Sequence, residues 1–130
     1  MKHYNVVAAV VCHDGKYLCM QKGKTKFEYT SYKWEFPGGK IEPGETPQQA
    51  LARELMEEME YPVEVGEELV TLNHEYPDFS ITMTAFLCTP KGDADGFKRR
   101  EHADSKWCSK DELKGLNWAA ADIDVVEGIL

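Results

Sequence analysis

Three glutamates, Glu54, Glu57 and Glu58, stand at i, i+3 and i+4 in one short segment of the chain. If this segment is helical, its rotation of about 100° per residue places the three carboxylates on one arc of the surface. Like charges at this spacing repel one another and destabilise an isolated helix. Hard divalent cations, which bind carboxylate oxygens, would reverse that penalty. The triad is therefore a candidate metal site, although acidic helix faces are often simply solvated.

The residues just upstream favour the metal interpretation. Gly38 and Gly39 let the backbone come close to an anion or a metal ion, and two further acids, Glu42 and Glu45, follow them. The net charge of −8 is also relevant, because an acidic protein that binds a polyphosphate needs metal ions to invert the local field. Together these features indicate a site for an anionic ligand that is held through a cation.

Capping signals define the helix that carries the glutamates. Thr46 is a good N-cap, Pro47 fits the first helical position, and Gln49 completes a capping box. The helix is expected to run from Pro47 to about Glu60, because Pro62 prevents it from continuing. The apolar stripe that should pack on a sheet comprises Leu51, Leu55, Met59, Ala52 and Met56.

Most of the remaining chain predicts β-strands. The expected strands are rich in β-branched or aromatic residues and are bounded by turn signals such as Asp14-Gly15 and Pro77-Asp78. They comprise residues 4–12, 16–21, 34–36, 63–76, 79–89 and 106–108. We expect the strand at 34–36 to stop at Pro37-Gly38-Gly39 and the polar segment 23–33 to form a loop.

Two further helices are expected near the C-terminus. Ser109 begins a capping box that starts the first of them, and the second should cover about residues 119–130. The residues of this last helix that are predicted to face the core are Ile123, Val126, Ile129 and Leu130. Since we find no repeat and no linker, the chain predicts one α+β domain over residues 1–130, with a mixed, curved sheet and helices packed against it.

The composition is that of a globular protein with enough residues for one core. Its acidic charge argues against nucleic acid polymers and anionic membranes as partners. The apolar stretch from Val6 to Cys12 is too short to span a membrane. The four cysteines lie far apart with no C-x-x-C pair, which is typical of buried thiols in a reducing compartment. We therefore expect a cytoplasmic protein.

Residues 39–61 resemble a known family motif. Gly39, Glu45 and the run from Arg53 to Glu58 follow G-x5-E-x7-R-E-U-x-E-E-x-G-U, the Nudix box, in which U is a bulky apolar residue. Every charged position and both spacings agree with the pattern. One position departs from it, because Glu60 stands where the family has the glycine that helps the chain leave the helix.

The resemblance extends to most of the chain. Residues 34–42 are similar to the segment that enters the box in the MutT-like subgroup, and residues 74–78 with 81–82 are similar to its later hairpin. The fold that this implies is an α/β/α sandwich with a mixed, curved sheet between helices. The implied reaction is metal-dependent hydrolysis of a nucleoside triphosphate to the monophosphate and pyrophosphate, which cleanses the nucleotide pool.

The resemblance also implies roles for individual residues. Glu57 and Glu58, together with the Gly38 carbonyl, would bind Mg²⁺, for which Mn²⁺ could substitute. Glu54 would orient or deprotonate the attacking water and also touch the metal. Arg53, which stands at i−4 from Glu57, would orient a glutamate of the box.

Glu101 is a further candidate for catalysis. It lies six residues before Trp107, where MutT-like proteins have an additional metal-linked glutamate. Because it belongs to the charged run 98–102, a catalytic role and a solvated-loop role are both open. His74 and His102 have no spacing that suggests a metal or a nucleophile, so we expect them to be structural or exposed.

Asp122 bears on the choice of base. Residues 116–123 resemble the segment in which MutT-like enzymes present one polar side chain to the base, and the pattern W-A-x-A-D-I is similar to the CTP-pyrophosphohydrolase branch. An ionised aspartate only accepts hydrogen bonds, so it favours a base edge with N–H donors, such as the amine of cytosine. A protonated aspartate that reads an oxidised purine, and an acid that only stabilises the helix dipole, are the open alternatives.

Lys22, Phe36 and Tyr76 complete the candidate substrate contacts. Lys22 falls near the place where MutT-like proteins have a basic phosphate or base contact, although an ordinary strand-end lysine fits equally well. Phe36 and Tyr76, like Trp34 and Trp118, are candidates for packing on the base. Core membership is the simpler interpretation for each of these aromatic residues.

The leading hypothesis is a pyrophosphohydrolase for CTP, dCTP or modified cytosine nucleotides. Such an enzyme would act on a small nucleoside triphosphate as a monomer or weak homodimer. One rival is an 8-oxo-dGTP hydrolase of the MutT type, and another is a non-catalytic Nudix domain that binds a nucleotide as a sensor. The presence of Glu54, Glu57 and Glu58 argues against the sensor.

Overall fold

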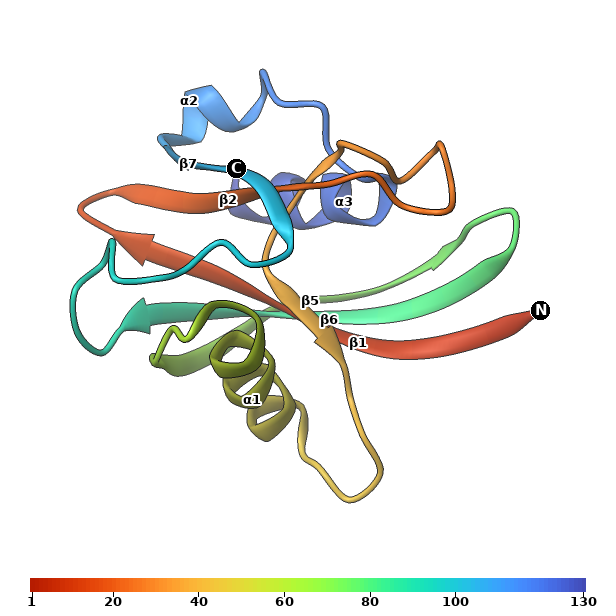
Figure 1. Cartoon of the computed structure of the whole chain (residues 1–130), viewed down its shortest axis with the longest axis horizontal. Coiled ribbons are helices and arrows are strands. Elements are labelled where there is room, and N and C mark those ends of the chain that lie inside the picture. Colours follow the sequence, from red (N-terminus) through yellow and green to blue (C-terminus); the bar gives the residue numbers. More distant parts are fainter.

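Seven strands and three helices form the chain, and the computed structural model describes all 130 residues (Figure 1). The strands are β1 (Lys2–His13), β2 (Lys16–Lys22), β3 (Trp34–Glu35), β4 (Gly38–Lys40), β5 (Val63–Glu75), β6 (Phe79–Pro90) and β7 (His102–Cys108). The helices are α1 (Pro47–Met59), α2 (Lys110–Leu113) and α3 (Ala120–Ile129).

The sheet is mixed, and β1 is its central strand. The strand order is β3-β2-β1-β6-β5, with β4 paired to β1 and β7 paired to β2. Strands β1 and β6 run parallel, whereas the other paired strands are antiparallel. Strand β2 pairs with β1 only beside the Asp14-Gly15 turn. Beyond that point β4 takes its place along β1, at Val6 to Ala8.

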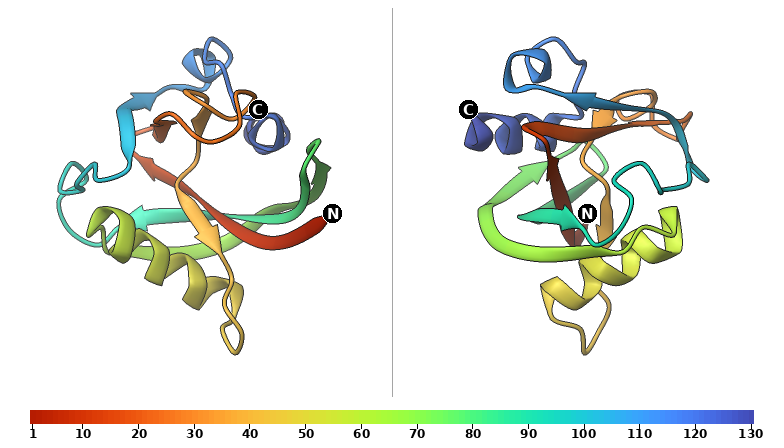
Figure 2. Two further views of the ribbon diagram at one scale, coloured as in Figure 1. Left: turned by 45° about the vertical axis from the view of Figure 1, so that its right-hand side comes forward. Right: turned by 90° about the vertical axis from the view of Figure 1, so that its left-hand side faces the viewer.

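Helices cover both faces of the sheet (Figures 1 and 2). Successive side chains of a strand point to opposite faces, and β1 contributes to both cores. Val7, Ala9 and Val11 pack in the cluster that contains α1, whereas Ala8 and Val10 pack in the cluster that contains α3. This arrangement confirms the predicted α+β sandwich with helices on either side of a mixed sheet.

Helix α1 forms as the capping signals predict. The Thr46 hydroxyl accepts a hydrogen bond from the Gln49 N–H at 3.1 Å, and the Gln49 side chain accepts one from the Thr46 N–H at 3.0 Å. Its buried residues are Ala50, Leu51, Leu55 and Met59. The prediction for Met56 is wrong, because this side chain is exposed. It lies about 60° beyond Met59 around the helix, outside the buried stripe.

The two long hairpins and the capping box at Ser109 also form as predicted. Strand β3 stops before Pro37 as expected, but Gly38 and Gly39 then belong to another strand, β4, and pair with Ala8 and Val7. A Cβ atom at Gly38 would overlap the backbone of Val7. Glycine is therefore required here for the close approach of two strands.

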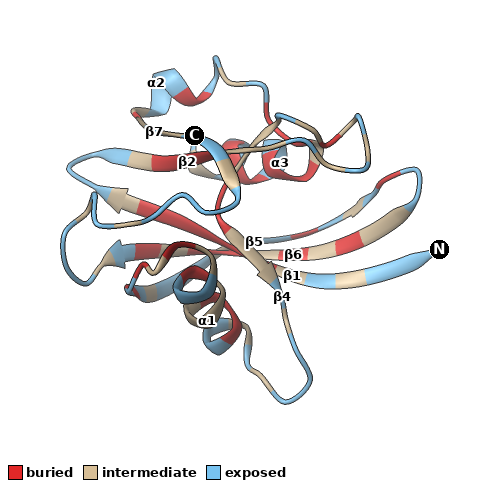
Figure 3. Cartoon of the chain, in the orientation of Figure 1, coloured by how far each residue is buried: buried red, intermediate tan, exposed pale blue.

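Helix α3 begins and ends near the predicted residues but presents a different face to the core. Its buried residues are Ala121, Asp122, Val125 and Val126. The predictions for Ile123 and Leu130 are wrong, since both side chains are exposed, whereas Ile129 is partly buried as expected. Figure 3 shows that α3 has both buried and exposed parts. The small residues of the helix pack inward, and with them the helix directs an aspartate into the protein.

Candidate active site

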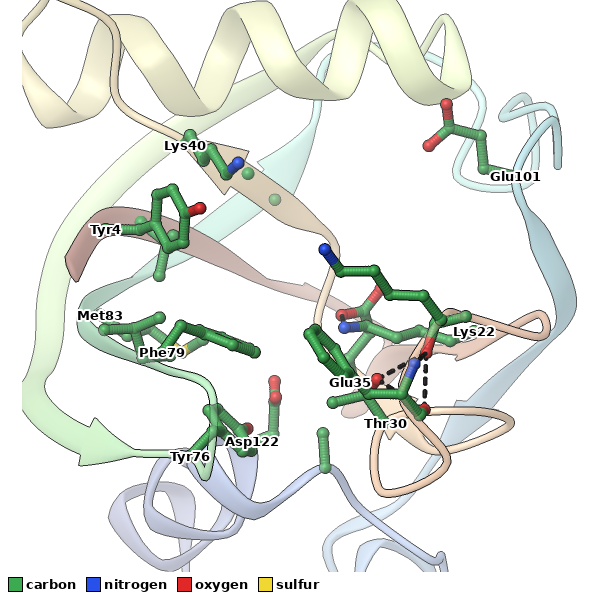
Figure 4. Close-up of a pocket in the computed structure, with 18 of the residues that line it drawn as sticks. Tyr4, Lys22, Thr30, Glu35, Lys40, Tyr76, Phe79, Met83, Glu101 and Asp122 are labelled. Carbon is green, nitrogen blue, oxygen red and sulfur yellow. Dashed lines mark hydrogen bonds and ion pairs between the residues drawn. The ribbon is translucent and has the colours of Figure 1, made fainter. Parts of the chain in front are cut away.

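A pocket of about 1120 Å³ is formed by residues of six strands, one residue each of α1 and α3, and connecting segments that are distant in the sequence. Its size is comparable to that of sites for small organic ligands. In Figure 4, Glu101 lies at one side of the pocket near α1, and Asp122 lies at the other near α3. Lys22 and Glu35 occupy the wall between them. The pocket therefore has an acidic end at α1 and a second polar end at α3.

At the acidic end, Glu58, Glu101, Gly38 and Gly39 line the pocket. Burial raises the pKa of Glu58 to about 8, and the nearby carboxylates of Glu54, Glu35 and Glu101 add to this effect. A Cβ atom at Gly39 would overlap the carboxylate of Glu54. Glycine at this position thus lets Glu54 lie against the backbone of β4.

Arg53 holds the acids of α1 and the preceding loop together. Its Nε donates to Glu45 Oε2 at 2.6 Å and its Nη2 to Glu45 Oε1 at 2.9 Å. Its Nη1 donates to Glu54 Oε1 at 3.0 Å and to Glu57 Oε2 at 3.1 Å. The Arg53 guanidinium also binds the Lys40 carbonyl at 3.0 Å. The arginine therefore joins the helix, the loop and β4 at one point.

The structure brings together only part of the predicted metal-binding set. Glu57 is bound to Arg53, its side chain is 61% exposed, and it does not line the pocket. No group of three carboxylate, histidine or cysteine side chains is already arranged around one point. The donor chemistry nevertheless fits a hard divalent cation, because the carboxylates of Glu54, Glu35 and Glu101 act on Glu58 where burial resists its charge.

At the opposite end of the pocket, Asp122 is only 3% exposed. Its Oδ1 accepts a hydrogen bond from the Phe36 N–H at 3.0 Å. Burial raises the pKa of Asp122 to about 8, and Glu35 adds to the shift while Lys22 opposes it. Burial therefore favours the protonated form of Asp122, which the sequence left open, and in that form the carboxyl group can both donate and accept.

The aromatic candidates belong to the core and to the pocket wall at once. Phe36 and Tyr76 are buried core residues that also line the pocket. Phe36 stacks on Trp118, with ring centroids 4.8 Å apart, and the Tyr76 hydroxyl accepts a hydrogen bond from the Ala121 N–H at 3.1 Å. Trp34 and Trp118 do not line the pocket. Both pack in the core, which is the simpler interpretation given for them above.

Lys22 lines the pocket and contacts Glu35, which in turn contacts His102. The sequence did not reveal this set of contacts. Its Nζ lies 3.5 Å from Glu35 Oε1, and Glu35 Oε2 lies 3.0 Å from His102 Nε2. The His102 side chain is only 5% exposed and lines the pocket, so the expectation of exposure is wrong. An acid between two aromatic residues, as in Trp34-Glu35-Phe36, was the available signal for Glu35.

The sequence model of the NUDIX domain matches residues 1–127. The chain is a Nudix hydrolase. A CTP pyrophosphohydrolase of Escherichia coli K12 is 36% identical over 131 residues, which cover 100% of this chain and 93% of that protein. An 8-oxo-dGTP diphosphatase of the same organism is 32% identical over 118 residues, or 90% and 86% of the two chains.

Solved structures of Nudix proteins agree with the fold. The solution structure of the E. coli ORF135 protein has a TM-score of 0.82 at 35% identity and covers 99% of this chain and 89% of its own. A MutT protein of methicillin-resistant Staphylococcus aureus 252 has a TM-score of 0.73 at 38% identity, with 99% and 97% covered. Nudix hydrolases act on small nucleotide substrates and use divalent metal ions. None of the helices in this structure has the length and apolar character of a membrane span.

The Nudix box of this chain ends in an unusual way. Glu60, which replaces the glycine of the pattern, is the C-cap of α1 and has φ 49° and ψ 42°. This is the left-handed conformation that glycine adopts easily and other residues adopt at a cost. The exit from the helix is therefore preserved without glycine.

Proposed function

We propose that this Nudix hydrolase cleaves nucleoside triphosphates to monophosphate and pyrophosphate, with a preference for cytosine nucleotides. The proposal depends above all on one observation. A single pocket joins a carboxylate-rich end at Glu58 and Glu101 to a buried hydrogen-bonding group, Asp122, at the other end (Figure 4). A triphosphate and its base would occupy these two ends.

The Nudix box supplies the groups for the reaction at the acidic end. We propose that Glu58, Glu57 and the Gly38 carbonyl hold Mg²⁺, with Glu57 exchanging its bond to Arg53 for the cation. Mg²⁺ would neutralise the triphosphate charge and activate water for attack. Glu54, which accepts a hydrogen bond from Arg53 at 3.0 Å, would orient that water and accept its proton. Glu101 faces the same end of the pocket.

Lysines of the pocket wall suit the phosphates. In a chain with a net charge of −8, the lysines that line this one pocket are Lys2, Lys22, Lys24, Lys26 and Lys40. They equal in number the acids of the lining, which are Glu35, Glu58, Asp78, Glu101 and Asp122. An anionic substrate therefore meets less repulsion in this pocket than over the chain as a whole. The ion pair between Lys22 and Glu35 keeps one of these ammonium groups in the wall between the two ends.

The protonated state of Asp122 favours cytosine. Cytosine presents an acceptor, N3, beside a donor, the N4 amine, and a neutral carboxyl group presents an O–H donor beside an acceptor. Two matched hydrogen bonds can therefore form while Oδ1 keeps its bond from Phe36. The name of the 36%-identical relative, a CTP pyrophosphohydrolase, supports the same choice. The alternative, 8-oxo-dGTP, offers adjacent N1–H and 2-amino donors that match an ionised carboxylate instead.

A panel of triphosphates tests the proposal. The purified protein would be incubated with Mg²⁺ and CTP, dCTP, 5-methyl-dCTP, 8-oxo-dGTP, dGTP or ATP, and the products separated by ion-exchange chromatography. We expect pyrophosphate release to be fastest with cytosine nucleotides. It should be lost with a chelator and in Glu57→Gln, and kept in Glu64→Gln, which alters an exposed glutamate outside the pocket.

The other outcomes separate the two parts of the proposal. A preference for 8-oxo-dGTP would retain the reaction and refute the assignment of the base. The absence of pyrophosphate release from every triphosphate, with Mg²⁺ and with Mn²⁺, would refute the reaction itself and favour the nucleotide-binding sensor.

A further inference from the structure

The segment that precedes β7 is fastened to the C-terminal end of α1. Glu60 Oε2 accepts from Lys98 Nζ at 3.0 Å and also binds Arg100 Nη2. The Arg100 Nη1 donates to the Glu57 carbonyl at 3.2 Å, and the Lys98 N–H donates to the Met59 carbonyl at 2.8 Å. One carboxylate thus connects the end of the Nudix helix to two basic residues of a distant loop.

The same segment is held at a second place by the residue after Glu60. The Tyr61 ring packs edge-on against Phe97, with centroids 5.4 Å apart, and its hydroxyl donates to the Ala94 carbonyl at 2.7 Å. Tyr61 fixes the beginning and middle of the loop, whereas Glu60 fixes its end. The residue that follows this end is Glu101.

The backbone conformation of Glu60 is unfavourable for a residue that has a side chain. A residue with a Cβ atom at φ 49° is strained, and glycine would relieve this strain. Glycine, however, could bind neither Lys98 nor Arg100. The Glu60 side chain therefore adds strain to the backbone, and the interactions that offset this strain are its ion pairs with Lys98 and Arg100.

We infer that Glu60 is a positioning residue for the reaction: by binding Lys98 and Arg100 it fixes the loop end so that Glu101 faces Glu58 across the acidic end of the pocket. Both of these carboxylates line the pocket. Glu58 is two residues before Glu60, and Glu101 directly follows Arg100. The inference rests on the proposed function, in which the acidic end holds the metal and the triphosphate.

The first test compares Glu60→Gln and Glu60→Gly with the wild type. Groups that orient metal ligands typically contribute about 10–100-fold to metal affinity or activity, so we expect kcat to fall about tenfold with KM changed less than about twofold. The Mn²⁺ dissociation constant, measured by electron paramagnetic resonance without nucleotide, should rise about tenfold. The Tm of Glu60→Gly should stay within a few degrees of wild type or exceed it, because the backbone strain is relieved.

Asp14→Gly provides the matched control. Asp14 also has a left-handed backbone, with φ 51°, but it lies in the β1–β2 turn and does not line the pocket. Replacement by glycine relieves the same type of strain there. We expect unchanged Mn²⁺ affinity and kcat, which would show that the effect at Glu60 comes from its side chain.

A double-mutant cycle with Glu101→Gln tests whether Glu60 acts through Glu101. In that background, Glu60→Gln should cause little further loss of Mn²⁺ affinity or kcat. An equal loss in both backgrounds, or no loss in either, would overturn the inference. The Mn²⁺ measurement needs no turnover, so it decides the role of Glu60 even if no triphosphate is hydrolysed and the proposed function fails.

Discussion

The two ends of the pocket are built in different ways. At the acidic end, the interacting residues lie within a short stretch of the chain, and Arg53 contacts Glu45, Glu54 and Glu57 through charged groups that are partly exposed. At the Asp122 end, the hydrogen bond to Phe36 joins residues 86 positions apart and is buried. Local sequence therefore defines the Nudix-box part of the acidic end, to which Glu101 is added from a distant loop, whereas the other end exists only in the completed fold.

The two ends are also expected to have different roles, catalysis at the acidic end and selection of the base at the Asp122 end. A carboxylate near solvent, such as that of Glu57, can exchange an arginine for a metal ion at little cost, because its charge remains solvated. A buried carboxyl group has no such freedom, and its protonation is determined by burial. We expect changes at the acidic end to affect kcat and changes at the Asp122 end to affect the choice of base and its dependence on pH.

The largest effect is expected for Glu58→Gln. Loss of a carboxylate that holds the metal should lower kcat by about a thousandfold, which corresponds to several kcal/mol of metal-assisted stabilisation. The Tm should not fall, because burial already opposes the charge of Glu58. Pyrophosphate release and thermal unfolding followed by circular dichroism would be measured together. An increase in KM with unchanged kcat would contradict the assigned role.

The two adjacent glycines of β4 are expected to have different roles, Gly38 in the stability of the fold and Gly39 in the reaction. Gly38→Ala should destabilise the protein by about 3 kcal/mol, because the new methyl group meets the Val7 backbone. Gly39→Ala meets only the movable carboxylate of Glu54. It should leave the urea midpoint nearly unchanged and lower kcat about a hundredfold, within the range for a general base. Equal loss of stability in the two variants would show that both glycines serve only the fold.

Asp122→Asn tests the buried end through pH. Between the ordinary aspartate pKa of about 3.9 and about 8, the folded protein binds a proton that the unfolded chain has released. The free energy of unfolding therefore falls by about 1.4 kcal/mol per pH unit as the pH rises through this range. Asparagine removes this loss and keeps a donor and an acceptor. Relative to wild type, the variant should gain about 3 kcal/mol between pH 5 and pH 7.5.

Urea unfolding at the two pH values checks this expectation. The neighbouring Glu35 raises the Asp122 pKa and Lys22 lowers it, so Lys22→Met should accentuate the wild-type trend. The same variants would be assayed with CTP and 8-oxo-dGTP. Parallel pH curves for Asp122→Asn and wild type would contradict a protonated Asp122.

The smallest effect is expected for Tyr29→Phe. The Tyr29 hydroxyl donates to Asp78 Oδ2 at 2.7 Å and connects the loop 23–33 to the β5–β6 turn. Loss of one exposed hydrogen bond should raise KM for the triphosphate about threefold at unchanged kcat. Tyr32→Phe, which alters an exposed tyrosine whose hydroxyl makes no such bond, is the matched control. A change in kcat would place Tyr29 closer to the reaction than we propose.

The sequence predicted much of the acidic end, because the residues of the Nudix box lie close together in the chain. Caps, periodicity and the Nudix box all refer to neighbours within a few residues, so the helix and the contact between Arg53 and Glu57 could be foreseen. The left-handed conformation of Glu60 follows from its place in the pattern. The orientation of Glu57 away from the pocket could not be foreseen, because it depends on which partner is present.

The errors concern tertiary contacts. By local sequence alone, Gly38 and Gly39 indicate a turn. They form a strand because they pair with the adjacent strand β1. The buried face of α3 and the protonation of Asp122 both depend on how the last helix packs. The burial of His102 beside Glu35 requires β2, β3 and β7 to be assembled.

The parallel pairing of β1 with β6 has a consequence for the order of folding. Lys2 pairs with Phe79 and Val11 with Cys88, and such distant contacts form slowly because a long loop must first be closed. During synthesis, α1 and its capping box can form as soon as they emerge. Asp122 reaches Phe36 only when nearly the whole chain has been made. A nascent chain would thus have its catalytic helix well before it has a place for a base.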